Sequence, residues 1–76
     1  MTEKLPRVTA DETIKALDKA GFFFARRSGS HKIYKNKKGK RTTVPYHSGK
    51  ILHPKTLKSI LRDADLTIDK FVELLK

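Results

Sequence analysis

The amino-acid sequence predicts a small α+β domain in which a helix, three antiparallel strands and a second helix form a two-layer sandwich, with a short helix at the C-terminal end. Three observations predict this class. Apolar residues recur at helical spacing near both ends of the chain, whereas the middle holds short aromatic or alternating segments separated by turns that contain glycine. The chain has only 76 residues, so we expect residues 1–76 to form a single domain.

The first helix is marked by a capping box. Thr9 is followed three residues later by Glu12, the pair whose side chains bond each other's backbone N–H groups at a helix start. Ile14 and Leu17 then continue an apolar stripe at helical spacing. Gly21 ends the pattern, so we expect a helix from about residue 10 until that glycine.

Three strand-like segments follow in series. Residues 22–28, "FFFARRS", are rich in aromatic residues, residues 31–35, "HKIYK", alternate, and residues 41–45, "RTTVP", end at a proline. "SGS" separates the first two, and a turn with Gly39 separates the second from the third. Short connections of this kind predict an antiparallel meander.

Two helices complete the predicted fold. After a loop over residues 46–53, Pro54 suits a first helical turn, and Leu57, Ile60 and Leu61 share one face. Thr67 caps a final short helix. Double-stranded-RNA-binding domains have the same chain order, an analogy that concerns the fold alone.

Positive charge is concentrated in the middle of the chain. The sequence has 18 Lys and Arg against 8 Asp and Glu, which gives a formal net charge of +10. From Lys19 through Arg62 there are thirteen Lys or Arg and no acidic residue. A field of one sign attracts a polyanion, so we expect a nucleic acid to bind. A basic surface that serves solubility and an anionic membrane surface are the alternatives.

The remaining composition indicates the compartment. The chain has no cysteine, and we find no apolar run long enough for a signal peptide or a membrane span. We therefore expect a cytoplasmic protein without a membrane partner.

Catalysis, if present, is expected to use a proton carrier rather than a metal. The basic middle of the chain holds no carboxylate that could bind a cation. His31 lies beside Arg26, Arg27 and Lys32, and follows Gly29. Imidazole can remove the proton of an RNA 2′-hydroxyl, and nearby cations can stabilise the phosphoryl oxygens after that oxygen attacks phosphorus.

The alternative is that His31 is a polar residue at the start of a strand. If Ile33 faces the core, alternation points His31 the same way, so His31 would have to lie at an open edge or in the preceding loop. His47 falls in an exposed loop and His53 precedes a helix, and neither has metal-ligand spacing.

Four motifs together resemble the HicA family of mRNA interferase toxins. They are Gly21 with its aromatic strand, "GSH" at 29–31 running into "KIY", "TVPYHSGK" at 43–50, and "LHPKTLKSILRDADLTIDKF" at 52–71. The resemblance implies a double-stranded-RNA-binding-domain-like fold, ribosome-independent cleavage of mRNA, and neutralisation by a HicB antitoxin. It also implies that His31, the histidine of the "GSH" motif, is the catalytic residue.

The resulting hypothesis is a metal-independent endoribonuclease that needs no cofactor. A non-catalytic RNA-binding module and a structural protein of ribosomes or the nucleoid are the alternatives. We expect Lys55 and Lys58 to add phosphate contacts at the start of the second helix, although a solvated polar face is the other interpretation of that stripe. The predicted RNA-binding residues are Arg26, Arg27, Ser28, Gly29, Ser30, Lys32, Lys35, Lys55 and Lys58.

Overall fold

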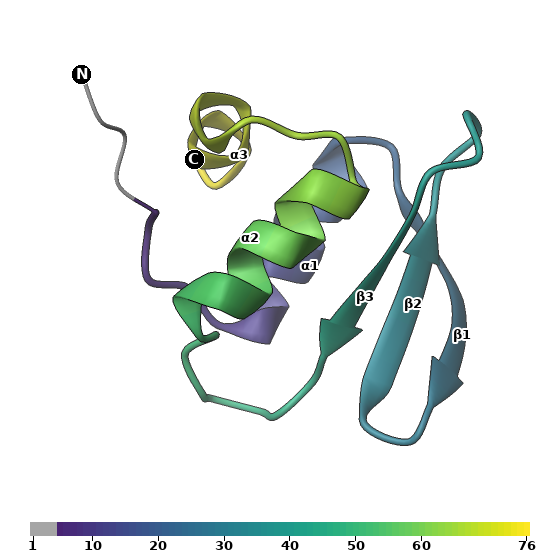
Figure 1. The fold of residues 1–76 in the computed structure, drawn as a ribbon, viewed down its shortest axis with the longest axis horizontal. Helices are drawn as coiled ribbons and strands as arrows, with labels where there is room; N and C mark the ends of the chain where they lie inside the picture. Colours follow the sequence, from purple (N-terminus) through teal and green to yellow (C-terminus); the bar gives the residue numbers. More distant parts are fainter. Residues whose placement is uncertain (1–4) are drawn as a thin grey trace.

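A computed structural model describes residues 5–76 and confirms the α+β class (Figure 1). Residues 1–4, which belong to the predicted single domain, lie outside the described residues. The elements are α1 (Ala10–Lys19), β1 (Phe23–Ser28), β2 (His31–Lys35), β3 (Arg41–Pro45), α2 (Pro54–Asp63) and α3 (Ile68–Leu74).

Helix α1 begins with the predicted capping box. The Glu12 N–H donates to Thr9 Oγ1 at 3.2 Å, and the Thr9 N–H donates to Glu12 Oε1 at 2.9 Å. Both donors would otherwise lack a partner at the start of the helix. Gly21 has a φ of +94°, a left-handed conformation that turns the chain from α1 into the sheet.

Side-chain caps also begin the two later helices. His53 Nδ1 accepts the Lys55 N–H at 3.1 Å, and Pro54 occupies the first turn of α2 as expected. Thr67 Oγ1 accepts the Lys70 N–H at 3.1 Å and begins α3. The predicted position of His53 at a helix start is therefore confirmed, and its imidazole serves the cap.

The three strands form the predicted antiparallel meander in the order β1-β2-β3. Strand β2 is central, so β1 and β3 are the two edges. Gly29 and Gly39 have φ values of +60° and +85° in the two connecting turns. At the second turn, Asn36 Oδ1 accepts backbone N–H groups from Lys38 and Lys40 at 3.1 and 2.8 Å, which holds the hairpin closed.

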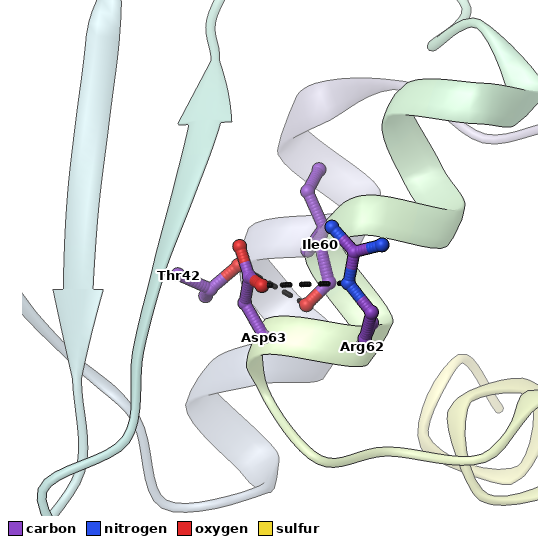
Figure 2. Close-up of polar contacts among 4 residues, drawn as sticks. All are labelled: Thr42, Ile60, Arg62 and Asp63. Atoms are coloured by element: carbon purple, nitrogen blue, oxygen red, sulfur yellow. Dashed lines mark hydrogen bonds and ion pairs between the residues drawn. The ribbon is translucent and has the colours of Figure 1, made fainter.

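The helices pack against one face of the sheet, at its β3 side (Figure 1). The Thr42 hydroxyl of β3 donates to the Ile60 carbonyl of α2 at 3.1 Å, as Figure 2 shows beside an exposed ion pair of 3.8 Å between Arg62 and Asp63. A buried apolar cluster joins α1, α2 and the sheet and consists of Ala10, Leu17, Phe22, Tyr34, Val44, Ile60 and Ala64.

A second cluster joins the three helices and consists of Val8, Ala16, Leu57, Leu61 and Phe71. By contrast, every residue of β1 is exposed, and β1 lies farthest from the helices in Figure 1. Burial is therefore concentrated between the helices and β3, and the β1–β2 hairpin extends beyond that core.

Candidate functional site

The pairing of the strands separates the sheet into two faces. Thr42 and Val44 of β3 are buried beneath the helices, and their partners on β2 are Tyr34 and Lys32. Because side chains alternate along a strand, the residues between them point to the other face. We name this the helix-free face, and the register assigns to it Phe23, Arg26, Ser28, His31, Ile33, Lys35, Arg41, Thr43 and Pro45.

Ile33 is buried, yet it lies on the helix-free face. Its exposed fraction is 7%, and it belongs to neither of the two helix-packed clusters. It pairs with Arg26 on one side and Thr43 on the other. From alternation alone, a core-facing Ile33 would point His31 towards the core as well. Alternation does place the two on one face, but this face is the one without helices.

His31 is exposed at the first position of β2. It pairs with Ser28 across the hairpin and with Pro45 on β3. Within residues 5–76, neither ring nitrogen of His31 takes part in a hydrogen bond, in contrast to the Nδ1 of His53. Both nitrogens are therefore free to meet a ligand, which a proton carrier requires.

The turn before His31 is fixed from two sides. Only the first of its two central residues, Gly29, has a positive φ, as in the type II′ turns that suit hairpins. The Tyr46 N–H donates to the carbonyl oxygen of Ser30 at 2.6 Å. This bond ties the turn to the chain that leaves β3, so the backbone next to His31 is held in place.

Three cations share the helix-free face with His31. Arg26 lies beside Ile33, and Lys35 and Arg41 pair with each other at the far end of β2. The one ion pair in the described part of the chain joins Arg62 and Asp63 on α2, so no acid neutralises these three. The face combines an exposed imidazole with uncompensated positive charge, which suits a phosphodiester.

Arg27 and Lys32 are paired with each other but lie on the opposite face from Arg26. The Lys32 ammonium is 3.9 Å from the centroid of the Tyr46 ring, and the Tyr46 hydroxyl donates to Asp11 Oδ2 at 3.2 Å. A cation over an aromatic ring is stabilised by the ring's quadrupole. The structure therefore does not bring all the predicted basic neighbours of His31 together.

Tyr34 lies on the same side as Lys32 and is 7% exposed. Burial, followed by the negative charges of Asp11 and Asp18, raises the pKa of the Tyr34 phenol above its ordinary value of 10.0. Its ring meets that of Phe24 edge to face, with centroids 5.7 Å apart.

The predicted α2 lysines stand on a separate element. Lys55 and Lys58 are both exposed, and the loop that leads to α2 runs from the end of β3 along the lower edge of the molecule in Figure 1. His47 is exposed within that loop, where the Lys50 N–H donates to the His47 carbonyl at 3.1 Å.

Two residues on the helix-free face, Arg41 and Phe23, were not among the predicted RNA-binding residues. Arg41 pairs with Lys35, and Phe23 also pairs with Lys35 from the other side. Arg41 belonged to the basic run but lacked a motif. The side of Phe23 depends on a β-bulge between Phe24 and Arg26, for which the sequence has no clear signal.

Residues 5–76 contain no group of three His, Asp or Glu placed to hold a metal ion together. In the same range, every helix is too short or too polar to cross a bilayer.

A family model described as the HicA toxin of bacterial toxin-antitoxin matches residues 10–66, which is more than half of the 76-residue chain. The matched range runs from the start of α1 to the residues after α2, and it includes His31 and the other predicted site residues. Among curated proteins, no sequence matches this chain.

Proposed function

Because this chain belongs to the HicA family of toxins from bacterial toxin–antitoxin systems, as its motifs predicted, we propose that it is an mRNA endoribonuclease that uses His31 as a proton carrier. The observation that carries the proposal is the position of His31. It is exposed, its ring nitrogens are free of hydrogen bonds within residues 5–76, and it shares a face with unneutralised cations.

The proposed reaction needs no metal and no cofactor. The His31 imidazole removes the proton of a 2′-hydroxyl, and the freed oxygen attacks the adjacent phosphorus. The P–O bond to the next nucleotide breaks, and its 5′-oxygen takes a proton from a group that we leave unassigned. The products are a 2′,3′-cyclic phosphate and a 5′-hydroxyl.

Arg26 is the proposed electrostatic partner of His31. It lies on the same face two pairs along the hairpin, because Ser28 pairs with His31 and Arg26 pairs with Ile33. A guanidinium can bind two phosphoryl oxygens at once, and positive charge stabilises the oxygens as charge builds on them.

The products and the substrate requirement test this reaction. We expect purified protein to cut single-stranded RNA without ribosomes and in the presence of a chelator, and to leave a 2′,3′-cyclic phosphate. The same oligonucleotide with every 2′-hydroxyl methylated should remain uncut, because the internal nucleophile is blocked. A linear 3′-phosphate formed without a cyclic precursor, or cleavage of the methylated strand, contradicts the mechanism. Binding without cleavage at excess protein favours the non-catalytic RNA-binding module instead.

An antitoxin partner follows from the family, and we propose that it is of the HicB type. The helix-free face is basic, so an antitoxin that covers His31 should present acidic side chains to it. We place toxin and antitoxin in the cytoplasm, where the proposed mRNA substrate occurs.

A further inference from the structure

Two adjacent phenylalanines of β1 are about equally exposed but lie on opposite faces of the sheet. The exposed fraction is 51% for Phe23 and 53% for Phe24. Phe24 pairs with Tyr34, so it lies on the helix side, where its ring meets Tyr34. Phe23 pairs with Lys35, so it lies on the helix-free face with His31.

A β-bulge determines which of the two phenylalanines lies on the face of His31. In a regular hairpin counted back from the Ser28–His31 pair, alternation would put Phe24 on the face of His31 and Phe23 on the helix side. The register instead shifts by one residue between Phe24 and Arg26, with Ala25 as the extra residue. Bulges of this kind redirect side chains, and here Phe23 and Arg26 come to share a face.

The helix-free face therefore offers two kinds of contact to a single nucleic-acid strand. Arg26, Lys35 and Arg41 supply positive charge for the phosphates. Phe23 supplies an exposed aromatic ring on which a base can stack, and stacking of this sort tolerates any base. A protein–protein interface usually has a broader apolar core than a single exposed ring surrounded by cations.

The distance between Phe23 and His31 suits a short stretch of single-stranded RNA. Phe23 is level with Lys35, four residues along β2 from His31. At about 3.3 Å per residue, this separation is roughly 13 Å. A stacked strand rises about 3.4 Å per nucleotide, so the ring and the imidazole are at most about four nucleotides apart.

From this arrangement we propose that single-stranded RNA crosses the helix-free face along β2, with Phe23 stacking on a base a few nucleotides from the phosphate at His31. The inference rests on the proposed ribonuclease function, and it adds where the substrate runs and which side chain holds a base. We call this path of the RNA the track. Phe24 and Arg27 lie on the helix side of the hairpin and do not contact the track.

The neighbouring phenylalanines form a matched pair for a test. We would measure binding of a fully 2′-O-methylated single-stranded RNA to the wild-type protein, Phe23→Ala and Phe24→Ala, each checked for folding by circular dichroism. Loss of a stacked base weakens binding by about 5- to 150-fold on alanine substitution, so Phe23→Ala should fall in that range. Phe24→Ala should stay within about twofold, and Phe23→Trp should restore tight binding.

A fluorescent base reports stacking itself. With 2-aminopurine placed in the strand, quenching at one position should disappear in Phe23→Ala and persist in Phe24→Ala. Should an alanine variant fail to fold, the leucine variant at that position replaces it. Unchanged binding by Phe23→Ala, or equal losses for the two variants, overturns the inference.

The methylated strand separates this inference from the proposed function. If wild-type protein binds it with the Phe23 dependence above but never cuts unmodified RNA, the ribonuclease proposal fails and the track stands. If unmodified RNA is cut normally while Phe23→Ala binds as tightly as wild type, the track fails alone. Binding of a protein partner that depends on Phe23, with RNA binding unaffected, also overturns the track.

Discussion

Substituting Gly29 should destabilise the hairpin that carries His31 for a backbone reason alone. Gly29 has a φ of +60°, and a Cβ placed there would meet no heavy atom within 4 Å other than those of its two chain neighbours. Clash with the rest of the structure therefore adds nothing, and the cost is the local one of holding an L-residue in a left-handed conformation, about 1–2 kcal/mol. Alanine also restricts the unfolded chain, which offsets about 0.4–1 kcal/mol. The expected net loss for Gly29→Ala is about 1 kcal/mol.

Thermal unfolding followed by circular dichroism measures this loss. A change of about 1 kcal/mol lowers Tm by about 4–8 °C in a domain of this size. Ser30→Ala is the matched control, because Ser30 is in the same turn, is exposed, and lacks a positive φ. It should leave Tm nearly unchanged. A Gly29→Ala protein as stable as wild type, or one no less stable than Ser30→Ala, would refute the reasoning about the turn.

Three further changes test other parts of the structure. Thr42→Val removes the buried hydrogen bond to α2 and should cost about 0.5–1.5 kcal/mol in urea unfolding, whereas Thr43→Val on the exposed side should cost almost nothing. Because burial raises the pKa of Tyr34 when folded, the stability it contributes is present below pH 10.0 and lost as pH rises through the folded pKa. Tyr34→Phe should therefore lose less stability than wild type as the pH rises above 10.0; an equal loss would contradict this. Arg26→Gln should reduce the slope of log binding constant against log salt by roughly 0.7, and Arg27→Gln should not change it; equal slopes for the two would place RNA elsewhere.

The local elements follow from the sequence because their signals are local. The capping box of Thr9 and the proline of α2 act within a few residues and mark where the two helices begin. The glycine turns act over a similar range, and the bounds of β2 and β3 match the predicted segments. The first strand begins one residue later than predicted, since Phe22 is drawn into the core between α1 and the sheet.

The faces of the sheet depend on contacts that the sequence does not display. Ile33 looks like a core residue, but its burial comes from the helix-free side. Arg26 and Arg27 look equivalent in the chain, yet pairing separates them. The bulge at Ala25 determines which phenylalanine shares the helix-free face with His31, and no residue type in "FFARRS" predicts a bulge. His31 was a candidate from its basic neighbours and the family motif added its catalytic role, but its position on the helix-free face came only with the register.

The most direct measurement compares two histidine variants under single-turnover conditions with chelator present. His31 is on the helix-free face, whereas His47 is also exposed but lies in the loop before α2. We predict that folded His31→Ala loses cleavage by about 100-fold or more while RNA affinity stays within about twofold, and that His47→Ala cuts like wild type. Cleavage at the wild-type rate by folded His31→Ala would contradict the account.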